Sequence, residues 1–181
     1  MLRLSGTRLL VVDFDNTLFF TDSCNALASK ELFGRCMSLH EIRALPKPEK
    51  NKVYRLTFSK YMHMCKPNRR LIRRLSKEHD AVIIVLTGQS REGMPVMQRL
   101  LECNGVNYDR LVMRLKSELR KKDERWKLER IQRLAKGYVS VELYEDKADN
   151  IAYILGGVKR NRVSAFLVTP RGIKPSDGLH H

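Results

Sequence analysis

The chain has 181 residues, 43% of them hydrophobic, which predicts one globular domain with a real core and room for a small insert. Its formal net charge of +15 and pI of about 10.0 favour polyanionic partners, nucleic acid before anionic membranes. The alternative is that the basic surface only keeps the protein soluble. No apolar run has the length of a membrane span and no signal peptide precedes the first predicted strand, so we expect a cytoplasmic protein with no membrane partner.

The first predicted strand covers about residues 8–14 and ends on two carboxylates. Its apolar run at 9–12 suits a strand that is buried on both faces of a parallel sheet. Asp13 and Asp15 stand at its carboxyl end, where open α/β sheets bind their ligands. Buried carboxylates need a cation, a proton or a hydrogen-bond donor, and Mg²⁺ is a natural partner. The alternative is a solvated turn or a helix cap.

Residues 21–66 contain no convincing strand. They carry helical patterns at about 23–33, 38–45 and 49–64. An insert of this kind predicts a small helical cap over the strand ends, with the core formed by residues 1–20 and 67–175. The alternative is a peripheral subdomain that has no part in the site.

Strands and helices alternate in the rest of the chain. The predicted strands are at about 81–86, 111–115, 138–144 and 163–168, and the predicted helices are at 67–78, 94–103 and 124–135. A further predicted helix follows Asp146 and ends near Gly156-Gly157. This alternation predicts right-handed crossovers and an α/β fold with a doubly wound, mostly parallel sheet of five strands.

Positive charge is clustered within these elements, which favours a functional patch over evenly solvated faces. The segment 110–136 holds eleven Lys or Arg against four acids. A second group lies on the predicted helix at 67–78 and consists of Arg69, Arg70, Arg73, Arg74 and Lys77. A third group lies around the last predicted strand and consists of Lys159, Arg160, Arg162, Arg171 and Lys174.

The four cysteines, Cys24, Cys36, Cys65 and Cys103, lie far apart in the sequence. They form no CxxC pair, and no histidine stands near them at the spacing of a zinc site. We therefore expect reduced, mostly buried thiols of a cytosolic protein.

Other chemically useful residues stand at later strand ends or helix starts. Thr87 and Gly88 follow the second strand and offer a hydroxyl and accessible backbone N–H groups to an anion. Glu145 and Asp146 follow the fourth strand, and Lys127 lies near a helix start, whose macrodipole favours anions. Because parallel strands end at one edge of a sheet, we expect the acids to bind a metal and Thr87 and Lys127 to hold phosphate oxygens.

This order of motifs resembles the haloacid dehalogenase-like (HAD) phosphohydrolase superfamily over about residues 8–168. The matching segments are Asp13-Phe14-Asp15-Asn16-Thr17, Thr87, Lys127, and Glu145-Asp146 with Asp149 following. More narrowly, Leu86-Thr87-Gly88, Trp126-Lys127-x-x-x-Ile131 and Tyr144-Glu145-Asp146-Lys147 resemble the HAD domains of "Swiss Army knife" RNA-repair proteins. The resemblance implies a HAD-like Rossmannoid fold.

The resemblance also implies roles for the acids. Asp13 would attack phosphorus and form an aspartyl-phosphate, and Asp15 would act as general acid and then general base. Asp13, the backbone carbonyl of Asp15 and Asp146 would hold Mg²⁺. Glu145 or Asp149 would orient metal-bound water.

For the phosphate, the resemblance implies that Thr87, Gly88 and Lys127 bind the transferring group and that Thr87 and Lys127 stabilise its oxygens. An aspartate at position 15 favours phosphatase or phosphotransferase chemistry over dehalogenation. No GxxxxGK[ST] loop is present, which argues against a P-loop kinase.

Three functions stay open at this stage. The first is a Mg²⁺-dependent phosphatase that acts on a nucleotide or on the phosphorylated end of RNA or DNA. The second is a phosphatase for a small metabolite, over which residues 21–66 would close. The third is a catalytically silent HAD fold that binds RNA or a protein. The complete set of acids, threonine and lysine argues against the third function.

Overall fold

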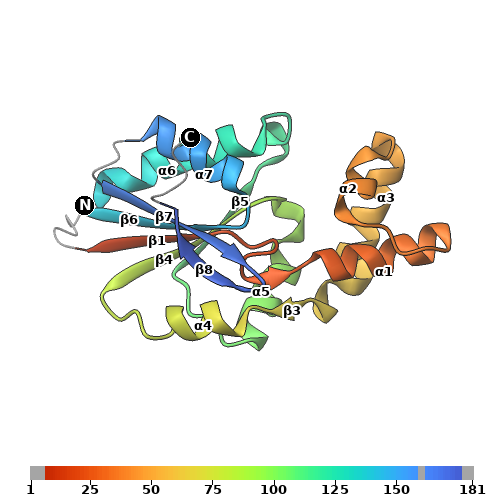
Figure 1. The fold of residues 1–181 in the computed structure, drawn as a ribbon, viewed down its shortest axis with the longest axis horizontal. Helices are drawn as coiled ribbons and strands as arrows, with labels where there is room; N and C mark the ends of the chain where they lie inside the picture. Colours follow the sequence, from red (N-terminus) through yellow and green to blue (C-terminus); the bar gives the residue numbers. More distant parts are fainter. Residues whose placement is uncertain (1–6, 159–161, 177–181) are drawn as a thin grey trace.

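The computed structural model describes residues 7–158 and 162–176, and the predicted α/β architecture is confirmed (Figure 1). The main sheet has the strand order β5-β4-β1-β6-β7-β8. The strands are β1 (Arg8–Val12), β4 (Ala81–Ser90), β5 (Arg110–Arg114), β6 (Ser140–Glu145), β7 (Val163–Thr169) and β8 (Gly172–Pro175). All neighbouring pairs are parallel except β7 with β8.

The prediction of five strands was one short. β8 pairs antiparallel with β7 along an edge of the sheet. It was not predicted because a segment of four residues with this composition shows no alternation of apolar and polar residues. Lys159 and Arg160, which were predicted to flank the last parallel strand, lie outside the described residues.

Helices cover both faces of the sheet (Figure 1). On one face lie α6 (Asp123–Leu134) and α7 (Ala148–Gly157), and on the other α4 (Arg69–Leu75) and α5 (Met94–Cys103). Leu10 and Val12 of β1 pack into the α4–α5 layer, whereas Leu9 and Val11 pack into the α6–α7 layer. The run at 9–12 is apolar throughout because both faces of β1 are buried. No helix within the described residues is long and apolar enough to cross a membrane.

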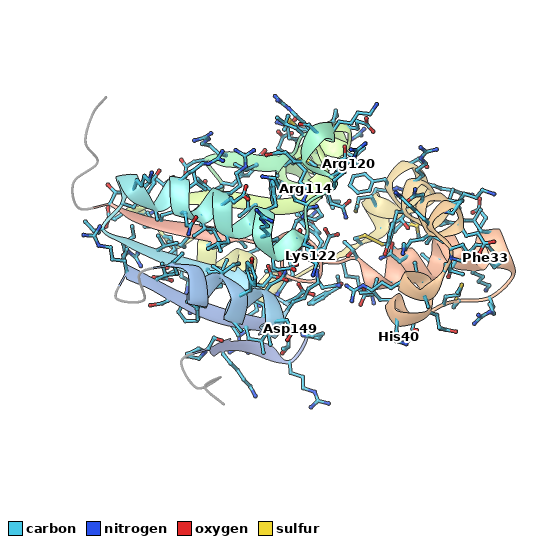
Figure 2. All side chains as sticks on the ribbon, turned by 90° about the horizontal axis from the view of Figure 1, so that it is seen from above. Phe33, His40, Arg114, Arg120, Lys122 and Asp149 are labelled. Carbon is cyan, nitrogen blue, oxygen red and sulfur yellow. A yellow bond between two sulfur atoms is a disulfide. The ribbon has the colours of Figure 1, made fainter. Side chains whose placement is uncertain are left out.

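The chain between β1 and α4 forms a separate helical lobe beyond the carboxyl end of β1 (Figures 1 and 2). Its elements are α1 (Asp22–Phe33), α2 (Leu39–Ala44), α3 (Lys47–Leu56), the π-helical turn η1 (Thr57–Tyr61) and the 3₁₀ turn η2 (Met62–Met64). The single predicted helix at 49–64 is therefore three consecutive elements. Ala28, Ile42 and Val53 form part of a small core inside the lobe.

Two very short strands join the lobe to the sheet layers. β2 (Phe19–Phe20) and β3 (Lys66–Pro67) pair antiparallel, and neither was predicted. Three further 3₁₀ turns, η3 (Arg91–Gly93), η4 (Lys116–Glu118) and η5 (Ala135–Gly137), connect elements of the core.

The expectation of reduced, mostly buried thiols was wrong. Cys24, at the start of α1, forms a disulfide with Cys65, which directly precedes β3. Cys36 and Cys103 are free but exposed. The pairing depends on the lobe bringing together two residues 41 positions apart, which sequence spacing does not reveal.

Candidate active site

The predicted acids converge beside β1, where the strand order of the sheet reverses. Asp13 directly follows β1, and its backbone N–H donates to the carbonyl of Tyr144 in β6 at 2.9 Å. Open α/β sheets bind ligands in the crevice at such a switch point. A cavity of about 270 Å³ opens there. Its lining residues are Asp13, Asp15, Gly88, Gln89, Arg114, Asp123, Lys127 and Lys147.

Asp13 is buried, with 4% of its surface exposed. One carboxylate oxygen accepts a hydrogen bond from Lys127 Nζ at 2.6 Å, and the other accepts a longer one from the Thr17 hydroxyl at 3.4 Å. Burial and the nearby charge of Glu145 raise the pKa of Asp13, although Lys127 opposes the rise. Burial is the larger cause, and a cation bound beside Asp13 would favour its ionised form.

A tight loop after Asp13 turns the chain so that a second carboxylate lines the cavity. Asn16 adopts a left-handed backbone conformation, φ 57°, which Asn tolerates better than most residues. Its backbone N–H donates to the carbonyl of Phe19 at 2.7 Å, and its side chain donates to Asp22 at 2.9 Å. These bonds hold the turn that directly follows Asp15.

Asp15 is held from the neighbouring strand. The side chain of Gln89 donates to Asp15 Oδ2 at 3.0 Å, and the Thr87 hydroxyl lies 3.5 Å from the same oxygen. Thr87 is fully buried and also accepts from the backbone N–H of Gln89 at 3.2 Å. Burial raises the pKa of Asp15, which favours the protonated form that an acid catalyst needs. Gln89 was not predicted, because a glutamine after Thr-Gly carries no distinctive signal.

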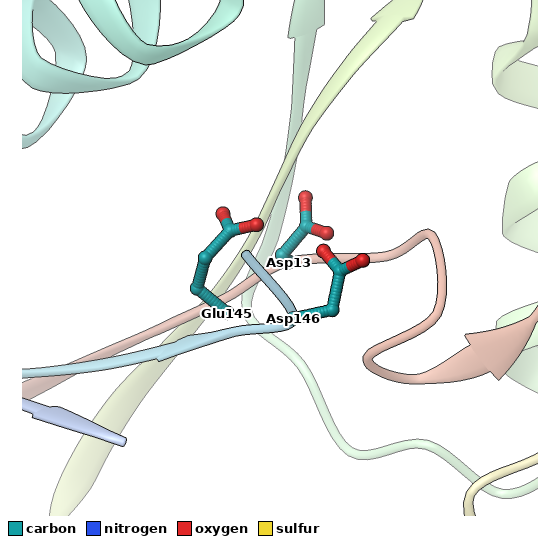
Figure 3. A group of neighbouring side chains, drawn as sticks. All are labelled: Asp13, Glu145 and Asp146. Atoms are coloured by element: carbon teal, nitrogen blue, oxygen red, sulfur yellow. The ribbon is translucent and has the colours of Figure 1, made fainter. Parts of the chain in front are cut away.

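Three carboxylates from β1 and β6 face one another (Figure 3). Asp13, Glu145 and Asp146 each offer an oxygen, and these oxygens lie within 4.8 Å of one another. Among the described residues, Asp146 Oδ1 is buried without a hydrogen-bond partner. Glu145 already accepts from Lys127 Nζ at 2.6 Å and from the backbone N–H of Lys147 at 3.3 Å. An all-oxygen group with an unsatisfied buried carboxylate oxygen fits a hard cation such as Mg²⁺.

Asp149 stands apart from this group. It is exposed in the first turn of α7 (Figure 2), whereas Glu145 is fully buried beside the cavity. Of the two residues predicted to act behind the metal ligands, only Glu145 lies with the other acids.

Lys127 connects the acids on β1 and β6 to helix α6. It is buried, and its Nζ lies 2.6 Å from both Asp13 and Glu145. Burial opposes its charge, but these two carboxylates raise the pKa of Lys127 well above its ordinary value. Asp123, one turn earlier on α6, lies 3.5 Å from the same Nζ and 2.7 Å from Arg114 of β5.

Asp123 is the centre of a charge network that was not predicted. In addition to Lys127 and Arg114, it lies 3.9 Å from Lys147 Nζ and accepts from Asn150 at 3.4 Å. Burial opposes ionisation of Asp123, but the surrounding cations hold its pKa below the ordinary value. The only sequence signal for this network was the four-residue spacing of Asp123 and Lys127 on one helix.

Gly88 has a packing role beside the site. A Cβ at this position would collide with the carboxylate of Asp123. The glycine therefore lets Asp123 approach the end of β4, in addition to leaving its own backbone accessible at the cavity.

Comparison with known proteins identifies the fold. No family model and no curated protein matches the sequence. A chain of the Pnkp1/Rnl/Hen1 complex matches with a TM-score of 0.61 and 17% identity, over 91% of this chain and 46% of that chain. A haloacid dehalogenase-like family hydrolase from Streptococcus pneumoniae matches with a TM-score of 0.60 and 12% identity, over 94% of this chain and 87% of that chain. A HAD-superfamily hydrolase from Geobacter sulfurreducens matches with a TM-score of 0.53 and 12% identity, over 89% of this chain and 86% of that chain.

The chain therefore has the fold of haloacid dehalogenase-like hydrolases, as the motifs predicted. It spans about half the length of the matched chain of the Pnkp1/Rnl/Hen1 complex. At these levels of identity the likeness establishes the fold alone.

Proposed function

We propose that the chain is a Mg²⁺-dependent phosphomonoester hydrolase that acts on a nucleotide or on a nucleic-acid end. One observation carries the proposal. Asp13 lies at the switch point of the sheet, 2.6 Å from Lys127 and within a group of three carboxylates, while Asp15 is held two residues further on. The proposed nucleophile, acid and cation thus line one cavity, and the other carboxylates of the proposed metal site lie beside Asp13.

The chemistry proceeds through a covalent intermediate. A carboxylate oxygen of Asp13 attacks phosphorus, the bond to the leaving oxygen breaks, and Asp15 donates its proton to that oxygen. Asp15 then takes a proton from water as the water attacks phosphorus. This second step releases inorganic phosphate and returns Asp13 to its carboxylate form.

Positive charge has to offset the repulsion between a phosphate monoester and the carboxylates. In the proposal, Asp13, the backbone carbonyl of Asp15 and Asp146 hold Mg²⁺, which supplies Lewis-acid stabilisation of the transferring group. Thr87, the backbone N–H groups at Gly88 and Lys127 bind the phosphoryl oxygens. Glu145 orients Lys127 through its 2.6 Å contact.

A basic cleft supports a polyanionic substrate. A cavity of about 500 Å³ lies between α4 and β8, and its lining residues are Arg70, Arg73, Arg74, Lys77, Glu78 and Ile173. Its one acid, Glu78, is ion-paired with Arg8 at 2.5 Å, so the cleft keeps an excess of positive charge. The similarity to a chain of an RNA repair complex points to the same class of substrate. A small-metabolite phosphatase remains the competing proposal, with residues 21–66 closing over the substrate as a cap.

The first test is turnover of p-nitrophenyl phosphate with Mg²⁺ and with a chelator. We expect activity only with the metal, and Asp13→Asn should abolish it because an amide is a far poorer nucleophile of similar shape. Asp80→Asn, at an exposed position before β4, is the matched control and should behave as wild type. Near wild-type turnover by Asp13→Asn would exclude the covalent mechanism.

The second test compares substrates. The set comprises 5′- and 3′-phosphorylated oligonucleotides, nucleoside monophosphates and sugar phosphates, each with and without Mg²⁺. Preference for sugar phosphates would favour the metabolite phosphatase. Binding of oligonucleotides without turnover of any compound would favour the silent module.

A further inference from the structure

A second cavity adjoins the candidate active site at the junction between the helical lobe and the sheet layers. It measures about 360 Å³ and lies between α3–η1 on one side and β4–η3–α5 on the other. Its lining residues include Tyr54, Phe58, Ser59, Gln89, Ser90 and Gly93. We name it the Tyr54 groove. Gln89 lines both this groove and the cavity that contains Asp13 and Asp15.

Gln89 places the groove on the leaving-group side of the reaction. Its side-chain amide donates to Asp15 at 3.0 Å, and Asp15 is the proposed acid. A general acid has to lie within hydrogen-bonding reach of the oxygen that it protonates. The group attached to that oxygen therefore begins beside Asp15 and Gln89, at the end of the Tyr54 groove.

The walls of the groove include two aromatic side chains, Tyr54 and Phe58, together with polar residues. Phe58 packs so closely against η3 that a Cβ at Gly93 would collide with its ring. Tyr54 is half-buried one helical turn earlier and packs against the small core of the lobe. Both rings are carried by α3 and by η1, a π-helical turn of the kind that is frequent at functional sites.

We infer that the Tyr54 groove binds the nucleobase next to the phosphate that the enzyme removes, with the base stacked on Tyr54. This inference rests on the proposed function and adds a binding site for the leaving group. An aromatic face suits a flat heterocycle of any sequence, because every base has a π-face. The hydroxyls of Ser59 and Ser90 can hydrogen-bond to the edge of a base.

Tyr54→Leu tests the inference, because leucine keeps apolar bulk against the lobe core but removes the ring. We expect KM for a nucleoside monophosphate to rise about 5- to 150-fold, which corresponds to the loss of one stacked base, with kcat unchanged. KM for glycerol phosphate should not change. Tyr54→Phe, which keeps the ring, should restore the wild-type KM within about twofold.

Tyr153→Ala is the matched control, since Tyr153 is an exposed tyrosine on α7 with 46% of its surface accessible. It should leave both KM values unchanged. An equal rise in KM for both substrates after Tyr54→Leu, or no rise for either, would overturn the inference.

A binding measurement separates this inference from the proposed function. Adenosine and uridine are titrated into wild type and Tyr54→Leu and followed by calorimetry, with no hydrolysis required. If wild type hydrolyses neither phosphate but binds nucleosides and the variant does not, the groove stands and the hydrolase proposal fails. If the wild type binds no nucleoside in that case, the groove is refuted as well.

Discussion

Lys127 contacts two buried carboxylates at once, and one positive charge cannot balance them together with Asp146. Burial strengthens each of these interactions and also makes any uncompensated charge costly. Asp123 is different, because Arg114 and Lys127 surround it and keep it ionised. At the scale of single residues, the site therefore has its excess negative charge where the metal is proposed to bind.

Asp15→Asn should lower kcat by about 10²- to 10⁴-fold, because the amide cannot donate the proton that the leaving oxygen needs. The loss should be smaller for p-nitrophenyl phosphate, whose leaving group needs little protonation, than for an alkyl phosphate. Steady-state kinetics with both substrates measures this. Equal losses, with chemistry rate-limiting, would contradict leaving-group protonation by Asp15.

Gly88→Ala should lower the free energy of unfolding by about 1–3 kcal/mol, because the new methyl group forces Asp123 away from its partners. Gly137→Ala is the control, since a Cβ there would meet no atom within 4 Å. Denaturant unfolding of both variants provides the comparison. An unchanged Gly88→Ala midpoint would show that Asp123 moves without loss.

At the scale of elements, the connection between lobe and core is the feature that most affects the site. The chain enters the lobe through β2 and leaves it through β3, and these two short strands pair with each other. The Cys24–Cys65 disulfide links the segments beside these two strands. The loop that ends at β2 also contains Asp15. The disulfide therefore holds the start of α1 and the exit from η2 together close to the loop that contains Asp15.

Reduction of this disulfide should lower the free energy of unfolding by about 4 kcal/mol, the chain-entropy value for a link that spans 41 residues. The measurement is denaturant unfolding with and without dithiothreitol. A variant with Cys36→Ser and Cys103→Ser should respond as wild type does, because those thiols are free. Identical unfolding curves in the two conditions would show that the link does not stabilise the fold.

At the scale of the whole molecule, net charge and the basic cleft between α4 and β8 act together. A charge of +15 attracts polyanions from any direction, whereas the cleft offers one place where several cations face a common space. Figure 2 shows Arg120 and Lys122 at the end of the core that faces the lobe, so positive charge also lies beside the candidate site. A nucleic-acid strand would find cations both at the site and away from it.

Affinity for oligonucleotides should fall steeply with salt and rise with length, because each neutralised phosphate releases counterions. Arg70→Gln combined with Arg73→Gln should weaken binding and reduce the salt slope by about 1–2. Lys30→Gln with Lys47→Gln, two exposed positions on the lobe, is the control. Fluorescence anisotropy with oligonucleotides of several lengths at two salt concentrations is suitable. A flat response to length and salt would favour the metabolite phosphatase.

The sequence by itself determined those features of the protein that follow from a local pattern of residues. A run of four apolar residues is typical of a strand that is buried on both faces of a parallel sheet, so β1 and the two acids after it were predictable. Because parallel strands end at one edge of a sheet, residues as distant as Asp13, Lys127 and Asp146 could be assigned to one site from their order along the chain.

Tertiary structure alone decided the features that depend on contacts between distant segments. The Cys24–Cys65 link, the pairing of β8, and the meeting of Tyr54 with Gln89 leave no periodic or compositional trace in either partner. Asp123 is similar, because its role comes from Arg114 on another strand. Local physics selects helix, strand and turn residue by residue, whereas the partner of a side chain is set only when the layers pack.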